Sequence, residues 1–335
     1  MRKRSIFKFA ACVASAITFH VSAANIDVVP GLSVEQMPKV TGELNFAHGF
    51  GLIYGAMPVA RYMGVMEKVF PNAKVTWQNI FTTAQQRDAM LAGRLHVGSC
   101  TPGPYLSSWD KGVEFRWLQT TGGFDAYLMV RPDGPKTLLE FIGTTKKLSP
   151  GPNTAQYFTV QEALRLAGKD VKSLDRNWVN LPHPDAVQAL IANQLDGHYA
   201  TSDFALRLQE QGMRKISSVK DTWGSLYPVG ACTLANIAKQ NPDMARGYAS
   251  ALKKTVEWMN ANPGKAAEML SKSVEGKVPA SEFTKYFQAG VYESYTTNAD
   301  LRAHARAMKT FGSITKEPKA PEDFYVFPVE SGPKW

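Results

Sequence analysis

The same pattern occurs in two stretches of this sequence: Ala92-Gly93-Arg94-Leu95-His96-Val97-Gly98-Ser99-Cys100-Thr101 and Asn193-Gln194-Leu195-Asp196-Gly197-His198-Tyr199-Ala200-Thr201-Ser202. Each begins at the end of a predicted helix, continues as a short strand and ends in small polar residues. In open parallel sheets, ligands bind outside the carboxyl ends of the strands. The repetition therefore predicts two similar lobes whose polar loops face each other across a cleft.

Strands alternate with helices around both stretches. The predicted strands are Glu43–Ala47, Lys74–Trp77, Leu95–Gly98, Phe115–Thr120, Ala126–Val130, Trp178–Leu181 and Gly197–Ala200. This alternation is typical of βαβ units and of a mainly parallel sheet covered by helices. From about Tyr227 onward the pattern becomes helical, with apolar faces suited to packing. We therefore predict an α/β fold.

A helix is predicted to begin in a stretch that precedes the second of these two segments: Ser149-Pro150-Gly151-Pro152-Asn153-Thr154-Ala155-Gln156-Tyr157-Phe158. The Pro-Gly breaks end the preceding strand, and Asn153 with Gln156 matches a capping box at the start of a helix. The first N–H groups of a helix and its dipole both favour negative charge. This stretch therefore predicts one anion-binding loop.

The first 24 residues have the composition of a secretory signal peptide. Arg2, Lys3, Arg4 and Lys8 precede an apolar run that ends near Phe19, and small residues follow at 21–24. This run is shorter than the roughly 20 residues of a membrane span, and no later segment approaches that length. We expect export to the periplasm without membrane insertion.

Charge, cysteine content and length narrow the class of protein further. The formal net charge of +9 would fall to +5 without the four basic residues of the signal, and the sequence has no basic blocks that would indicate nucleic-acid binding. Cys100 and Cys232 would remain, either as a disulfide or as two free thiols, and their spacing does not indicate a metal site. A mature chain of about 310 residues exceeds the usual size of one core, so two lobes are expected.

Several segments in this order are familiar as a set: Leu44–Tyr54, Leu91–Gly98, Lys147–Phe158, Pro184–Leu190 and Trp258–Pro263. Together they resemble the periplasmic substrate-binding proteins of ABC importers, in the nitrate/sulfonate/taurine subfamily that also contains thiamine-precursor binders. The resemblance covers residues 41–315. His96 stands where the family often has Asp, and Tyr199–Phe204 replaces a segment usually richer in Trp.

The resemblance implies a two-lobed type II fold with two mainly parallel sheets and two hinge crossovers, near 124–130 and 221–231. Residues 41–125 and 228–335 would form one lobe and residues 126–227 the other. The implied function is non-enzymatic: a monomeric soluble receptor, without cofactor or metal, captures a small anion and delivers it to an ABC permease and its ATPase.

The strand pattern and the resemblance together assign the ligand contacts to four loops. Glycines would let the backbone approach the ligand, hydroxyls and N–H groups would donate to an oxyanion, and the carboxylate would accept from a ligand amine, as in taurine. The assigned residues are His48, Gly49, Phe50, Gly51, Ser99, Cys100, Thr101, Asn153, Thr154, Ala155, Gln156 and Asp203. The histidines at 96, 183, 198 and 304 have no metal-ligand spacing, and we assign them to packing or surface roles.

The ligand class stays open at this point. Sulfonates, including taurine, are preferred, and nitrate and carboxylates are alternatives. A second possibility is a pyrimidine, thiamine-precursor or aromatic ligand, with Phe50, Trp223 and Tyr227 as stacking faces. Eukaryotic pyrimidine-precursor synthases share the implied fold, but their cysteine-rich motif is absent here, as is the G-x-S-x-G elbow of serine hydrolases.

Overall fold

A computed structural model gives the structure of the chain and describes residues 24–49, 52–80, 83–290, 292–296, 301–320 and 323–327. The predicted signal peptide, apart from Ala24, lies outside these residues. Phe50 and Gly51 of the first predicted ligand loop also lie outside them. No helix in the described ranges is long and apolar enough to cross a membrane.

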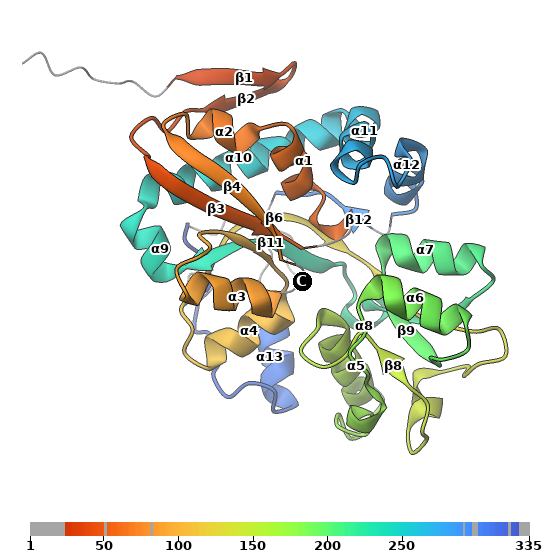
Figure 1. Ribbon diagram of the computed structural model, residues 1–335. Helices are drawn as coiled ribbons and strands as arrows, with labels where there is room; N and C mark the ends of the chain where they lie inside the picture. Colours follow the sequence, from red (N-terminus) through yellow and green to blue (C-terminus); the bar gives the residue numbers. More distant parts are fainter. Residues whose placement is uncertain are drawn as a thin grey trace, which may run out of the picture.

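One mixed sheet forms what we term the first lobe. Its strands are β3 (Gly42–His48), β4 (Ala73–Asn79), β5 (Gly98–Cys100), β6 (Phe115–Phe124), β11 (Tyr227–Leu234) and β12 (Tyr292–Glu293). A bridge between Phe46 and Val97 joins the β3-β4 pair to the rest, so the strand order is β4-β3-β5-β11-β6-β12. The antiparallel hairpin of β1 (Asn25–Val29) and β2 (Leu32–Glu35) lies outside this sheet (Figure 1).

A second sheet forms what we term the second lobe. It contains β7 (Ala126–Val130), β8 (Leu148–Ser149), β9 (Gly197–Thr201) and β10 (Arg214–Ser218) in the order β10-β7-β9-β8. Trp178 adds one parallel bridge to Leu148 at the β8 edge. The predicted strand Trp178–Leu181 is therefore reduced to this bridge, because the short turn η3 (Asp175–Asn177) precedes it and β8 itself has two residues.

The two sheets have the same topology, as the repeated sequence pattern predicted. The order β4-β3-β5-β11-β6 in the first lobe corresponds to Trp178-β8-β9-β7-β10 in the second. Each sheet contains one strand that arrives from the other lobe, which is β11 in the first sheet and β7 in the second. This strand pairs antiparallel with both of its neighbours. The other strands of the order given above run parallel to one another. The predicted mainly parallel α/β fold is therefore confirmed, with one inserted antiparallel strand in each sheet and the short antiparallel strand β12 at the edge of the first.

The chain passes between the sheets in two places. β6 belongs to the first sheet and β7 to the second, and Asp125 alone separates them. The return runs from β10 through α8 (Val219–Trp223) to β11. Asp125 Oδ1 accepts a hydrogen bond of 3.1 Å from the Lys220 backbone N–H, so the two crossovers are tied to each other.

Helices cover both sheets. Those of the first lobe are α1 (Ala56–Tyr62), α2 (Val65–Val69), α3 (Thr83–Leu91), α4 (Pro102–Asp110), α9 (Ala235–Gln240), α10 (Pro242–Ala261), α11 (Pro263–Ser273), α12 (Ala280–Gln288), α13 (Arg302–Thr310) and the 3-10 turn η1 (Leu52–Tyr54). Those of the second are α5 (Ala155–Leu166), α6 (His183–Ile191), α7 (Ser202–Glu210), α8, and the 3-10 turns η2 (Leu138–Phe141) and η3. The long helix α10 packs on β6, and its Tyr248 also meets Phe46 of β3 edge to face at 4.8 Å.

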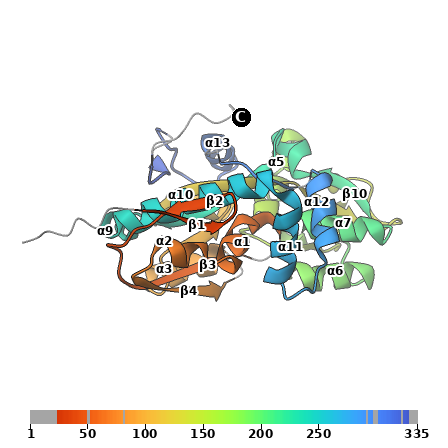
Figure 2. The ribbon, with the colours of Figure 1, turned by 90° about the horizontal axis from the view of Figure 1, so that it is seen from above.

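Two C-terminal helices reach the second lobe. α12 packs beside α7, as both views show, and α13 packs against α4 and α5 (Figures 1 and 2). The C-terminal part of the chain therefore contacts both edges of the second lobe.

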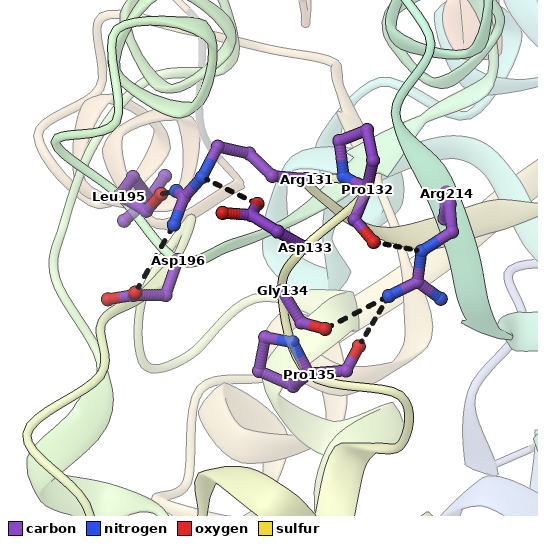
Figure 3. Close-up of polar contacts among 8 residues, drawn as sticks. All are labelled: Arg131, Pro132, Asp133, Gly134, Pro135, Leu195, Asp196 and Arg214. Atoms are coloured by element: carbon purple, nitrogen blue, oxygen red, sulfur yellow. Dashed lines mark hydrogen bonds and ion pairs between the residues drawn. The ribbon is translucent and has the colours of Figure 1, made fainter.

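Arginine clamps stabilise the turn at the far end of the second lobe (Figure 3). Arg214 donates to the carbonyls of Pro132 at 3.0 Å, Gly134 at 3.0 Å and Pro135 at 3.2 Å. Arg131 donates to the Leu195 carbonyl at 2.8 Å. These bonds replace the ladder bonds that β7 loses where it ends, so the charges here serve the turn.

Candidate ligand-binding site

The four predicted ligand loops follow the carboxyl ends of parallel strands. In the first lobe they follow β3 and β5, and in the second they follow β8 and β9. The loops adjoin in a ring: Gly49 of the first contacts Ser99 of the second, and α4 packs against α5. The β8-β9 pairing then connects the third loop to the fourth, and α7 packs against η1 in the first.

Ser99 organises the first-lobe loops from a buried position. Its Oγ accepts the Gly49 N–H at 2.9 Å and an Nε2–H of Gln86 at 3.1 Å, and its own N–H donates to Gln86 Oε1 at 2.5 Å. Gly49 leaves room for the ring of Tyr54, which a Cβ at this position would overlap. With 1% of its surface exposed, Ser99 holds the two loops together and is saturated by protein partners.

Cys100 and Cys232 are buried free thiols. They lie on neighbouring strands, with Cys100 opposite Gly230 and its Sγ 3.7 Å from the Gly230 carbonyl oxygen. Burial raises the pKa of the Cys100 thiol well above its usual range. Of the two states that the sequence left open, the structure has the free thiols, in an apolar cluster with Trp117.

The helix after the second loop has no free N-terminal donors at its start. The prolines at 102 and 104 lack an N–H, and the Gly103 N–H donates to the Tyr227 hydroxyl at 3.0 Å. Thr101 is the N-cap residue, 5% exposed, and its side chain makes no capping bond. The Pro- and Gly-rich residues at 102–104 thus form the first turn of α4, where proline is tolerated. This turn cannot act as an anion site in the way that a typical helix N-terminus does.

The helix after the third loop is different. Thr154, not Asn153, is its N-cap: its Oγ1 accepts the Tyr157 N–H at 3.2 Å and donates to the Gly151 carbonyl at 2.7 Å. Asn153 is exposed and left-handed, with φ of 59°. The predicted capping box of Asn153 with Gln156 is therefore wrong by one residue, since Gln156 occupies the second helical position and not the third.

This first turn of α5 leaves donors unused. The N–H groups of Ala155 and Gln156 precede the first intrahelical bond, which Phe158 N makes to the Thr154 carbonyl at 3.2 Å. The Gln156 side chain is 4% exposed and makes no hydrogen bond within the described residues. The amide atoms are not among the fully enclosed unpaired groups of the described residues, so water or a ligand can reach them. The N-terminus of α5 and the Gln156 amide together fit an anionic group.

Asp203 lies in the first turn of α7, after β9. It is 7% exposed, and its Oδ1 has no hydrogen-bond partner among the residues that the structure describes. Burial raises its pKa to about 6, and the charge of Arg207 and two backbone N–H groups act in the opposite direction. An acceptor of this kind suits a ligand group that donates hydrogen bonds.

Sequence reasoning missed a buried polar chain beneath these two loops. Ser149 Oγ lies 2.7 Å from His198 Nδ1, and His198 Nε2 lies 3.0 Å from His183 Nδ1. The His183 ring stacks on Phe204, next to Asp203, with centroids 5.5 Å apart. Burial lowers the pKa of His183 to about 4 and also lowers the pKa of His198 well below its usual value, so both are neutral near pH 7. The histidines pack as predicted, but they also connect the third and fourth loops.

His48 also occupies a packing position. Its Nδ1 lies 2.9 Å from the Gly49 carbonyl and its Nε2 3.4 Å from Arg61 Nη1, and burial lowers its pKa. The predicted first-loop contact thus reduces, within the described residues, to the backbone around Gly49. No group of His, Cys, Asp and Glu suited to a metal ion occurs in the described part of the chain.

The lobes touch at several points around the ring of loops. The Phe158 ring of α5 lies on Gly103 of α4, where a Cβ would overlap it. At one edge Ser313 donates to Gln161 Oε1 at 3.0 Å, and at the other Arg207 Nε donates to the Tyr286 hydroxyl at 3.1 Å. Within the second lobe, Trp223 Nε1 donates to Thr159 Oγ1 at 3.0 Å, and Tyr227 at the crossover is fully buried.

No protein-family model matches the sequence, and no curated protein sequence matches it either. Solved structures do resemble the chain. The periplasmic aliphatic sulphonate binding protein SsuA from Escherichia coli aligns with a TM-score of 0.66 and 17% identity over 88% of this chain and 95% of that one. The alkanesulfonate-binding protein SsuA from Xanthomonas axonopodis pv. citri, bound to MOPS, gives 0.69 and 15% over 83% and 94%.

The periplasmic nitrate-binding protein NrtA from Synechocystis PCC 6803 gives a TM-score of 0.63 with 15% identity over 83% of each chain. At these identities the likeness concerns the fold. The chain has the two-lobed fold of the periplasmic binding proteins, and its structural neighbours include sulfonate- and nitrate-binding members of ABC import systems. The resemblance seen in the sequence is confirmed at this level.

Proposed function

We propose that this protein is the substrate-binding receptor of an ABC import system and that it captures a small anion between its lobes, with a sulfonate as the preferred class. The carrying observation is the first turn of α5, where the Ala155 and Gln156 N–H groups and the Gln156 amide lack protein partners within the described residues. Neutral donors at a helix N-terminus hold an anion without a full countercharge, which permits release.

Asp203 narrows the ligand class within this proposal. A carboxylate with an unused oxygen would repel a simple anion but would accept hydrogen bonds from an ammonium or hydroxyl group. An aminosulfonate such as taurine offers both ends, an anion for α5 and a donor for α7. Two structural neighbours are sulfonate-binding proteins, and one of them is bound to MOPS, itself a sulfonate.

The proposal also covers the localisation of the protein, its division into lobes and its partners. Residues 1–24 would direct the chain to the periplasm, and residues 41–125 with 228–335 and residues 126–227 would form the two lobes. The crossovers at Asp125 and α8 support this division. The protein would act without catalysis as a monomer and would present its closed form to a permease and its ATPase.

Calorimetric titration tests the proposal. Wild-type protein is titrated at pH 7.5 with ethanesulfonate, taurine, nitrate, acetate and a pyrimidine, and the same ligands are used in thermal shift. A ligand at 100 times its Kd should stabilise the protein by about 2.7 kcal/mol. Gln156→Ala should weaken the bound anion about tenfold, the scale of one hydrogen bond to a charged group. Gln188→Ala, at an exposed glutamine of α6, should change nothing.

The titrations also define failure. Binding of the pyrimidine without binding of any anion would replace the anion proposal with the aromatic alternative. Anion binding that is equal in wild type and Gln156→Ala would remove the first turn of α5 from the site.

A further inference from the structure

Arg207 connects the second lobe to the C-terminal helix α12. Its Nε donates to the Tyr286 hydroxyl at 3.1 Å. Tyr286 is 2% exposed and meets Phe283 edge to face at 6.0 Å, so its ring is held by the first lobe. α7 and α12 lie side by side in both views (Figures 1 and 2). This bond therefore exists only when the two lobes are close together at this edge.

The same arginine faces the candidate ligand carboxylate. Asp203 and Arg207 are four residues apart on α7, so their side chains share one face of the helix. The Arg207 charge favours the ionised form of Asp203, while burial disfavours it. Asp203 Oδ1 makes no hydrogen bond in the described part of the chain while Arg207 is bonded to Tyr286. Arg207 thus interacts with both groups, with Tyr286 through a hydrogen bond and with Asp203 through its charge.

We propose that Arg207 is a positioning residue that links the charge on Asp203 to closure of the second lobe on α12. An ionised Asp203 without another donor attracts Arg207 and weakens its bond to Tyr286. A ligand donor that bonds to Asp203 reduces this attraction, and Arg207 then holds Tyr286 across the lobes. The inference rests on the proposed function only in assigning Asp203 to the ligand.

A neighbouring ion pair provides a matched control. Lys285 and Glu210 join the same two helices with Nζ and Oε1 3.9 Å apart, and both side chains are 58% exposed. Exposed pairs of this kind contribute little. Loss of this pair should therefore leave the arrangement of the lobes unchanged, whereas loss of the Arg207–Tyr286 bond should alter it.

The test uses ligand-free protein. Spin labels at Lys68→Cys and Gln194→Cys, exposed residues of the two lobes, report the interlobe distance, and the native thiols are buried. Tyr286→Phe should lower the closed-to-open ratio about fivefold, as expected for one hydrogen bond from a charged donor. Asp203→Asn should raise the ratio. Glu210→Ala should match wild type, and it leaves the closer Lys285–Glu282 pair at 2.7 Å intact. In the Asp203→Asn/Tyr286→Phe double variant the gain from Asn should disappear.

Two results would overturn the inference. One is a wild-type distance distribution in Tyr286→Phe, confirmed as folded by circular dichroism. The other is a gain from Asp203→Asn that persists without the Tyr286 hydroxyl. Arg207→Lys, which retains the charge and loses the guanidinium geometry, provides a second variant if Tyr286→Phe does not fold. Since no ligand is present, failure of the proposed function would appear only in the titrations above.

Discussion

Replacement of Asp203 by Asn should stabilise the protein at neutral pH. The carboxylate is 7% exposed, and one of its oxygens has no partner among the described residues. Keeping it ionised inside the fold costs free energy because water solvates a carboxylate better than this environment does. Asn has nearly the same shape and carries no charge. The variant therefore removes the cost and keeps the packing.

The magnitude follows from the pKa. Burial raises the pKa of Asp203 from an ordinary 3.8 to about 6 in the folded protein. At 1.36 kcal/mol per pH unit, this difference makes the ionised group about 3 kcal/mol destabilising above pH 7. The Asn amide must itself be accommodated, so a net gain of about 1–3 kcal/mol is expected.

The sign of the pH dependence provides a sharper test. Between pH 3.8 and 6 the folded protein binds more protons at Asp203 than the unfolded chain does, so this group lowers stability as pH rises. The gain from Asp203→Asn should thus be about 3 kcal/mol at most at pH 8 and below about 1 kcal/mol near pH 4. Urea unfolding of wild type and variant across this range measures the difference.

Asp185→Asn is the matched control, because Asp185 also lies in the first turn of a helix but is exposed. It should change stability by less than about 0.5 kcal/mol at every pH. A destabilised Asp203→Asn protein, or a gain independent of pH, would refute the reasoning. The stabilised variant should also lose affinity for a ligand with a donor group, since a residue kept for binding is often costly for stability.

Three further predictions concern the loops and their supports. Thr154→Ala removes the α5 cap and should cost about 1 kcal/mol in urea unfolding. Asn153→Gly, which keeps the left-handed conformation at an exposed position, should not reproduce the loss of a cap. Gly103→Ala places a methyl group in the Phe158 ring, so it should cost about 1–3 kcal/mol of stability or separate the lobes. Thermal unfolding and the interlobe distance measure these two effects, and an unchanged protein would contradict the observed contact. His183 and His198 are neutral in the fold and titrate near 6.5 when unfolded, so they should lower stability as pH falls from 6.5 toward 4, and His183→Gln should flatten that fall.

The fold class could be predicted from the sequence because its two lobes repeat the same local patterns. Short strands after helices, each followed by small polar residues, predicted two similar α/β lobes, and the two sheets share one strand order. The crossovers were also expected near Asp125 and α8. What local patterns do not give is pairing: β7 looks like an ordinary strand, and only the assembled sheet shows that it is antiparallel to its neighbours. The strand β11 was missed altogether, since the pattern was expected to become helical from about Tyr227.

Side-chain roles were less predictable, for physical reasons. Asn and Thr are both good N-caps, and Asn also tolerates the left-handed conformation, so the order Asn153-Thr154 admits two assignments that differ by one residue. The prolines after Thr101 end a strand and equally begin a helix. The Ser149–His198–His183 chain depends on the register of β8 against β9, which no single-sequence pattern specifies.

The two halves of the candidate site differ despite their common topology, and this difference assigns them different tasks. In the first lobe the loop groups are satisfied internally: Ser99 by Gly49 and Gln86, and the Gly103 N–H by Tyr227. In the second lobe one oxygen of the nearly buried Asp203 has no partner within the described residues, and the Gln156 side chain makes no hydrogen bond there either. Unsatisfied groups gain most from a ligand, because binding removes a cost already present in the fold. We therefore expect the second lobe to select the ligand and the first lobe to close over it, so that substitutions at Gln156 or Asp203 change which ligand binds, while Ser99→Ala mainly changes stability.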